Sequence, residues 1–146
     1  MGTRWLQSVL AVSLLALASV PAVAIDEQAA KDQAVAAAKS WLALVDDGKY
    51  GESWDSAAGL FQAATTRANW EATLGKVRQP LGKVVARTFR SAQRTTDLQG
   101  APAGEYVVIQ YATSFENLTS AVETVTPVRD RDGAFKVTGY FIRPGQ

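Results

Sequence analysis

The chain has 146 residues, 47% of them hydrophobic, with 15 Lys and Arg against 14 Asp and Glu. This is the composition of one globular domain, and its nearly balanced charge gives no electrostatic reason to bind nucleic acid. Cysteine and histidine are both absent, which excludes disulfide bonds and removes the commonest general base and metal ligand. We therefore expect no metal site and no cofactor.

Residues 1–24 have the pattern of a secretory signal peptide. Arg4 supplies a positive charge, residues 5–20 are mostly apolar, and Ala22-Val23-Ala24 places small residues where a signal peptidase cleaves. The alternative is an uncleaved membrane anchor, but the apolar run is shorter than the roughly 20 residues that a spanning helix needs. The pattern favours cleavage after Ala24.

Cleavage would leave one domain, residues 25–146. It removes Arg4 and leaves equal numbers of basic and acidic groups, 14 of each. The residue after the cleavage site is Ile25, whereas bacterial lipid attachment needs a cysteine there. We therefore expect a periplasmic or secreted protein with no stable membrane span.

Helices are predicted in the first half of the domain. An alanine-rich segment runs from Asp26 to Gly48, and glycine at its end can adopt the left-handed conformation that commonly terminates a helix. One face of this segment repeats apolar residues at helical spacing: Ala34, Ala38, Trp41 and Val45.

Two further helices follow this one. The second is predicted from about Tyr50 to Phe61, with Trp54 on its apolar face. The third should begin at Thr66, a good N-cap residue, and stop near Arg78 because Pro80 disfavours helix before it. Its apolar stripe is Trp70, Leu74, Val77 and Leu81. Each helix therefore presents one tryptophan, and we interpret all three as core residues.

The second half of the domain predicts four strands. Lys83–Thr96 fits a long, half-exposed strand with a bulge, because neither alternating set of residues is cleanly apolar. A loop at Asp97–Gly104 leads to the second strand, Glu105–Phe115, and Ala121–Val128 forms the third. The fourth, Ala134–Arg143, follows Asp132-Gly133, a hairpin signal whose two central residues should have positive φ.

Alternation assigns the strand faces. In the second strand the more apolar face consists of Val107, Ile109, Tyr111, Thr113 and Phe115. In the fourth strand, one face should carry Phe135, Val137, Gly139 and Phe141, and the other Lys136, Thr138, Tyr140 and Ile142. Gly139 is a candidate for a bend or bulge.

Helices followed by antiparallel strands indicate an α+β fold. The economical arrangement packs the N-terminal helices on a curved four-stranded antiparallel sheet. It resembles the cystatin-like and nuclear-transport-factor-2-like (NTF2-like) folds, in which a curved sheet and its helices often enclose a pocket.

A set of short motifs spans nearly the whole domain: Trp41-Leu42, Asp47-Gly48-Lys49-Tyr50, Glu52-Ser53-Trp54, Trp70, Arg78-Gln79-Pro80-Leu81-Gly82, Arg87, Gly104-Glu105-Tyr106-Val107-Val108, Phe115, Glu123-Thr124-Val125, Asp132-Gly133 and Gly139-Tyr140-Phe141-Ile142-Arg143. As a set, they make the chain similar to the bacterial domain-of-unknown-function 4019 family (DUF4019). The resemblance implies an exported bacterial domain and brings no known activity with it.

Arg87 and Glu123 are the first candidate site, because both charges lie inside predicted strands. They could line a pocket on the concave face of the sheet and bind a ligand together with Tyr111 and Tyr140. The interpretation favoured is a structural ion pair or two solvent-facing side chains. In an NTF2-like enzyme, Glu123 could also move a substrate proton with Tyr106, Tyr111 or Tyr140 as its partner.

Two other patterns are weaker. Asp130-Arg131-Asp132-Gly133 resembles the opening of a calcium loop, but the later oxygen ligands are missing, so a turn is favoured. Arg90 and Arg94 lie close to Arg87 in sequence, yet a strand divides them between two faces. A small anionic partner is one interpretation, and a solvated strand is the one favoured.

The favoured function is a non-catalytic module that binds a small molecule or an envelope protein. Lack of histidine, cysteine and any nucleophile motif favours binding over chemistry. The first alternative is a small NTF2-like pocket enzyme that uses a carboxylate as acid or base. The second is an envelope assembly protein that pairs through an edge strand, and either a monomer or a homodimer is compatible with the sequence.

Overall fold

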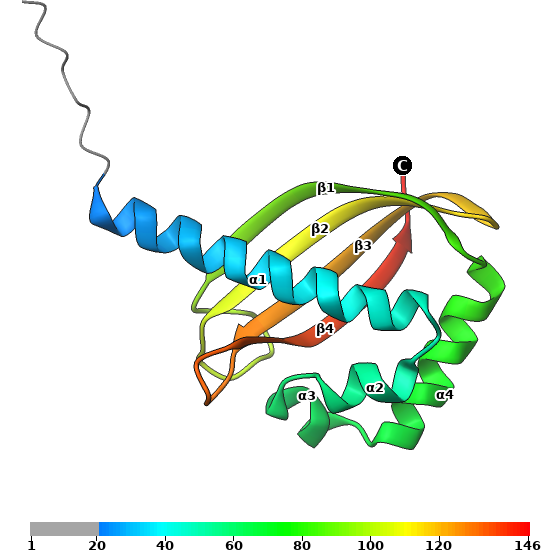
Figure 1. Ribbon diagram of the computed structural model, residues 1–146, viewed down its shortest axis with the longest axis horizontal. Helices are drawn as coiled ribbons and strands as arrows, with labels where there is room; N and C mark the ends of the chain where they lie inside the picture. The colour runs from blue at the N-terminus through cyan, green and yellow to red at the C-terminus, as the bar shows by residue number, and fades with distance from the viewer. Residues whose placement is uncertain (1–20) are drawn as a thin grey trace, which may run out of the picture.

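The computed structural model describes residues 21–146 as helices packed on one face of a four-stranded sheet. The α+β fold class is confirmed (Figure 1). The predicted signal peptide lies outside the described residues, except for its last four positions. Among residues 21–146, no helix combines the length and the apolar character needed to cross a membrane.

The elements follow one another in the predicted order. The helices are α1 (Ala22–Asp46), α2 (Tyr50–Asp55), α3 (Gly59–Ala64) and α4 (Arg67–Arg78), with a 3-10 turn, η1 (Gln79–Leu81), after them. The strands are β1 (Val84–Thr95), β2 (Tyr106–Phe115), β3 (Leu118–Arg129) and β4 (Phe135–Pro144). All neighbouring strands are antiparallel, in the spatial order β1-β2-β3-β4.

Helix α1 crosses the inner face of the sheet (Figure 1). Its predicted stripe is confirmed, since Ala34, Ala38, Trp41 and Val45 are all buried. The small alanines let the helix backbone approach the strands, and the larger residues at its C-terminal half fill the core. Gly48, with φ of +74°, ends the helix as expected.

The second predicted helix is instead two short helices. The chain leaves α2 at Ser56 and starts α3 at Gly59. Between them, the backbone N–H of Ala58 donates to the carbonyl of Val137 in β4, at 2.9 Å. A tertiary hydrogen bond to the sheet thus replaces the helical one, and periodicity alone carries no information about such a contact.

Helix α4 begins and ends as predicted, but its buried face is different. The Thr66 side chain caps it by accepting from the Asn69 N–H. Trp70 and Leu74 are buried, whereas Val77 is 43% exposed and Arg78, at the next four-residue step, is buried in its place. The spacing of the apolar residues did not indicate that the charged side chain of Arg78 faces inward.

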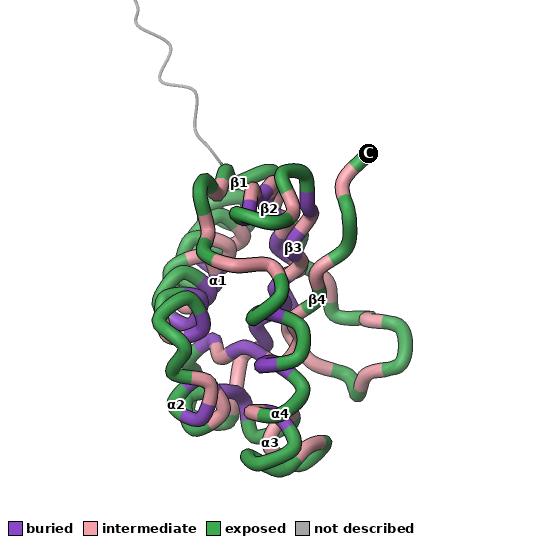
Figure 2. The backbone as a smooth tube through the Cα atoms, turned by 90° about the vertical axis from the view of Figure 1, so that its right-hand side faces the viewer, coloured by how far each residue is buried: buried purple, intermediate pink, exposed green. Residues whose placement is uncertain are grey.

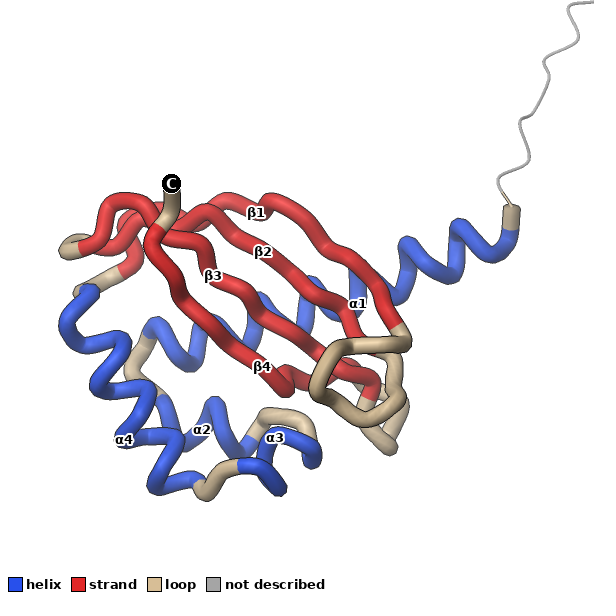
Figure 3. Tube along the Cα trace, turned by 180° about the vertical axis from the view of Figure 1, so that it is seen from behind, coloured by secondary structure: helices blue, strands red, loops and turns tan. Residues whose placement is uncertain are grey.

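Bulges shape the sheet. Strand β1 has two irregularities in its register, at Val85 and Arg90, which confirms the predicted bulge. The apolar face of β2 is also confirmed: Val107, Ile109, Tyr111, Thr113 and Phe115 are all buried. These residues face α1, and the opposite face of the sheet has no helix over it (Figure 3).

The face assignment of β4 is wrong beyond its first half. Phe135 and Val137 point into the core as predicted, but the register shifts between Thr126 and Pro127 of β3, opposite β4. After the shift Tyr140 turns toward the core, while Phe141 is 70% exposed. One extra residue in a strand exchanges its two faces, so the strict alternation assumed from sequence fails there.

The β3–β4 hairpin is present, with a longer turn than predicted. Residues 130–134 form the loop, in which the Asp130 N–H donates to the Ala134 carbonyl at 2.8 Å. Only Gly133 has a positive φ, +82°, so the expectation of positive φ at both Asp132 and Gly133 is wrong for Asp132.

Aromatic side chains contribute to the core between helices and sheet. Figure 2 shows the buried stretches of the backbone on the facing sides of the helices and the strands. The rings of Trp41 and Trp70 lie 6.1 Å apart, and Tyr140 meets Trp41 edge-on at 5.2 Å. Both buried indoles use Ser53: Trp41 donates to its carbonyl at 2.8 Å, and Trp70 to its hydroxyl at 2.9 Å. Trp54, half-buried, donates to the Thr65 carbonyl. The tryptophans are therefore core residues, as interpreted.

Candidate functional site

Glu123 lies at the centre of the inner face, on β3, with no exposed surface. One carboxylate oxygen accepts from Arg87 Nε at 2.7 Å and from Thr113 Oγ1 at 2.5 Å. The other accepts from Arg87 Nη2 at 3.2 Å and from the Tyr140 hydroxyl. The four strands supply one of these residues each, so the register of the sheet assembles the site. Such saturation is what allows a carboxylate to be buried.

Asp46 extends the arrangement to the helices. It is the last residue of α1, and it accepts from Arg87 Nη1 at 2.6 Å and from Arg87 Nη2 at 3.0 Å. Arg78, from the end of α4, donates to Asp46 at 3.0 Å and to the Tyr140 oxygen at 3.4 Å. We call the whole set the buried charge network, although it reaches the surface at Asp46, whose side chain is 27% exposed. Its members are Asp46, Arg78, Arg87, Thr113, Glu123 and Tyr140.

The network contains two guanidinium groups and two carboxylates, so its formal charge is zero. Burial lowers the pKa of Arg87, but hydrogen bonds and charge from Asp46 and Glu123 outweigh it and raise that pKa above its ordinary value. Burial raises the pKa of Asp46, but Arg87 and Arg78 outweigh it and hold that pKa below the usual range. Burial, and then the charge of Glu123, raise the pKa of Tyr140. Tyr140 therefore stays a protonated hydrogen-bond donor.

The structure brings together three of the four candidate site residues, namely Arg87, Glu123 and Tyr140. Tyr111 is not hydrogen-bonded to Glu123; its ring packs edge-on against Phe89 at 6.1 Å. Tyr106, considered as a proton-transfer partner, lies elsewhere, where its hydroxyl donates to the Pro102 carbonyl at 2.7 Å.

Sequence reasoning missed Asp46, Arg78 and Thr113. Asp46 directly follows the buried Val45 on α1, which places it at the edge of the apolar stripe. Arg78 lies four and eight residues after Leu74 and Trp70, on the stripe itself. A search for charged residues in register with the apolar stripes would have found both of them.

A hollow of about 390 Å³ opens beside the network, between α1 and strands β1 and β2. We call it the α1–β1 slot, and its lining residues are Val35, Lys39, Leu42, Arg87, Phe89 and Tyr111. Phe89 is 51% exposed there. Within residues 21–146, no carboxylate pairs with Lys39, so its ammonium group is free to meet a ligand.

The Asp130–Gly133 segment is a turn, as favoured. Lys136 Nζ lies 2.8 Å from Asp132 and 3.6 Å from Asp130, so an ammonium group of the protein already pairs with both carboxylates. Asp130 also accepts from the backbone N–H groups of Gly59 and Arg131. Over the described range 21–146, no group of three or more acidic, His or Cys side chains is placed to hold a metal ion.

The chain belongs to a family of proteins of unknown function (DUF4019), whose sequence profile matches residues 37–140. The match begins within α1 and ends at Tyr140, so it contains every member of the buried charge network. No curated protein and no solved structure matches the chain at a significant level.

Proposed function

We propose that this DUF4019 protein is an exported, non-catalytic binding module that holds a small amphipathic anion in the α1–β1 slot. The observation that carries the proposal is the slot itself, which combines an apolar wall with the unpaired ammonium group of Lys39. Its volume of about 390 Å³ falls in the range of about 300–1,000 Å³ that is usual for small-molecule sites.

The state of Glu123 supports binding rather than acid–base chemistry. Both of its oxygens already accept two hydrogen bonds, and its side chain has no contact with solvent. A general base must come within hydrogen-bond reach of the proton that it removes. A substrate could reach Glu123 only by displacing Arg87 or Tyr140, which speaks against the NTF2-like enzyme alternative.

The lining of the slot points to the class of ligand. Val35, Leu42 and the rings of Phe89 and Tyr111 offer an apolar surface, and burying it against a ligand is favourable. Lys39 stands on the α1 side and can pair with a carboxylate or sulfonate head group. An aromatic or short aliphatic acid satisfies both parts of the slot.

Features of β1 disfavour the assembly alternative. This strand is an edge of the sheet, so its outer backbone groups are unpaired within the described chain. It carries two bulges, and it contains Arg87, Arg90 and Arg94. Bulges and charged side chains are the devices by which edge strands avoid pairing with a second chain.

Export is part of the proposal because of the signal-peptide pattern in residues 1–24. A periplasmic or secreted location would bring the slot into contact with small molecules of the envelope. The proposed partner is therefore a small molecule, with an envelope protein as the alternative.

Titration with 8-anilinonaphthalene-1-sulfonate, an aromatic anion whose fluorescence rises in apolar sites, tests the proposal. We expect saturable binding at one site, weakened several-fold by Lys39→Gln and abolished by Val35→Phe, which fills the slot. The matched controls are Lys76→Gln on α4 and Ala36→Phe on the exposed side of α1, which should both bind like the wild type. Equal binding by Val35→Phe and the wild type would refute the site.

Native mass spectrometry of the mature protein purified from its own periplasm identifies the natural ligand. A co-purifying organic acid, lost after mild denaturation and absent from Val35→Phe, is the expected result. Protein that is bare in every preparation, and that also fails to bind the dye, would overturn the proposed function.

A further inference from the structure

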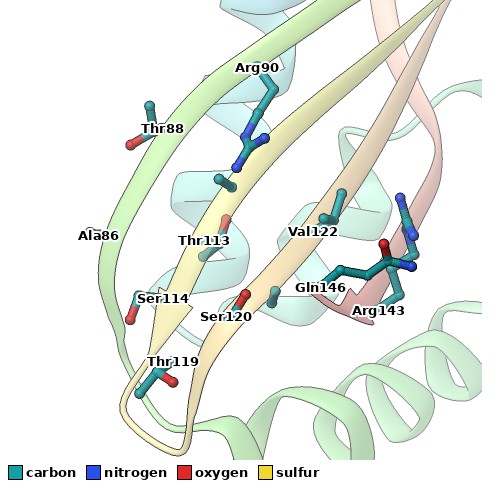
Figure 4. Close-up of a pocket in the computed structure, with 13 residues that line it drawn as sticks. Ala86, Thr88, Arg90, Thr113, Ser114, Thr119, Ser120, Val122, Arg143 and Gln146 are labelled. Atoms are coloured by element: carbon teal, nitrogen blue, oxygen red, sulfur yellow. The ribbon is translucent and has the colours of Figure 1, made fainter.

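A second hollow, of about 450 Å³, lies on the outer face of the sheet, away from the α1–β1 slot. It occupies the end of the sheet near the β2–β3 turn and the C-terminus (Figure 4). We call it the outer groove. Figure 3 shows that no helix covers this face of the sheet.

The floor of the groove consists of residues that are paired with one another across the strands. Thr88, Ala112, Val122 and Arg143 form one row across all four strands, because each is the register partner of the next. Thr88, Ala112 and Val122 have short side chains, whereas Arg143 at the β4 end of the row has a long one. Short side chains beside a long one leave space above the sheet, and this space is the groove.

Two arginines stand over this floor. Arg143 comes from β4, and Arg90 occupies the second bulge of β1. Figure 4 shows the Arg90 side chain reaching from β1 toward β2, over the groove. In the described part of the chain neither guanidinium makes an ion pair, in contrast to the fully paired Arg87 on the inner face.

The rest of the lining is rich in hydroxyl groups and free of acidic side chains. The residues that can present a hydroxyl here are Thr88, Ser114, Thr119 and Ser120, while the hydroxyl of Thr113 donates to Glu123 on the inner face. Even with the α-carboxylate of Gln146 counted, the two guanidinium groups leave the groove net positive. Arginine donates in a fork that matches phosphate and sulfate oxygens, and short hydroxyls can donate to the oxygens that remain.

We propose that the outer groove is a second binding site, for a small polar oxyanion of the phosphate- or sulfate-monoester class. The proposal is independent of the α1–β1 slot, because the two hollows share no lining residue and lie on opposite faces. The slot is mainly apolar and suits an amphipathic acid. The outer groove is mainly polar, and its hydroxyls can also meet the hydroxyls of a sugar that carries the charged group.

The test is an NMR titration of the mature protein with glucose 6-phosphate, read from backbone amides and arginine Nε signals. We expect saturable shifts at Ser114, Ser120 and Val122, and at the Nε groups of Arg90 and Arg143. Inorganic phosphate should compete for the same signals. Glucose alone, and sodium chloride at matched ionic strength, should leave them in place.

Single variants assign the charge contribution. Arg90→Gln and Arg143→Gln should each weaken binding about tenfold, the usual effect of losing a hydrogen bond to a charged group. Arg131→Gln in the exposed β3–β4 turn is the matched control and should bind like the wild type. All three residues are exposed, so folding should be unaffected, and the dispersion of the NMR spectrum checks this.

Three results would overturn the proposal. The first is an equal loss of binding in Arg131→Gln, which would mean attraction to any exposed cation. The second is a set of shifts that sodium chloride reproduces. The third is saturable binding that maps to the α1–β1 slot and is lost in Val35→Phe, which would make the slot the only anion site of the two.

Discussion

Replacement of Glu123 by glutamine removes one negative charge from the buried charge network with almost no change in volume. The amide has one acceptor oxygen and one NH2 donor, whereas both oxygens of Glu123 now accept hydrogen bonds. In either orientation of the amide, an N–H of Arg87 faces the NH2 group. The hydroxyls of Thr113 and Tyr140 can rotate to accept, but arginine has no acceptor to offer.

The structure sets the size of the effect. Removal of one partner from a buried ion pair costs about 3–5 kcal/mol. Arg87 keeps its two hydrogen bonds to Asp46, so we expect the lower end, about 3 kcal/mol. With a urea m-value of about 1.5 kcal/mol/M, this loss moves the unfolding midpoint down by about 2 M.

Urea unfolding followed by tryptophan fluorescence measures the loss, since Trp41 and Trp70 are buried close to the network. Glu71→Gln, which breaks the exposed pair with Arg67, is the matched control and should change the midpoint far less. A midpoint for Glu123→Gln equal to that of the wild type would refute the claim that the buried carboxylate is held by charge.

Two further predictions concern the same core. Ser53→Ala should lower the free energy of unfolding by about 1–3 kcal/mol, because it leaves the buried indole N–H of Trp70 without its acceptor. In a Trp70→Phe background, the same substitution should lower the free energy of unfolding by less. The second prediction concerns acid. Arg87 and Arg78 lower the pKa of Asp46 in the folded state. The contribution of Asp46 to the stability of the fold is therefore complete above its unfolded pKa of about 4, and it is lost as the pH falls through the lowered folded value. The free energy of unfolding, measured between about pH 6 and pH 2, should fall less steeply for Asp46→Asn, and an unchanged slope would contradict the linkage.

Sequence patterns predicted the features of the fold that depend on local chemistry. The apolar stripe of α1, the Thr66 cap and the alternation of β2 each follow from the spacing of a few side chains in one segment. They agree with the structure because segment and tertiary context favour the same conformation there. Charges inside strands that have an apolar face singled out Arg87 and Glu123 as candidates, but that pattern did not show that they meet each other and Tyr140.

The remaining features depend on contacts between distant segments. The break between α2 and α3 comes from a hydrogen bond to Val137, about 80 residues further along the chain. The exposure of Phe141 comes from one extra residue in β4, which alternation within that strand does not show. The burial of Arg78 was not predicted, because a charged side chain is expected at the surface. Asp46 and the ring of Phe115, 5.0 Å away, make its buried position favourable.

The buried charge network also determines where a ligand can bind. Its cations and carboxylates pair with one another across all four strands and two helices, with only Nε of Arg78 left without a partner among the described residues, so opening it would leave unpaired charges in the core. Binding with the network intact is therefore restricted to the periphery. The α1–β1 slot and the outer groove both lie there, and each has unpaired positive charge beside it: Lys39 at the slot, and Arg90 with Arg143 over the groove. On this argument, a variant that weakens the network should lower stability while leaving the affinity of the outer groove unchanged, since the groove shares only Thr113 with it.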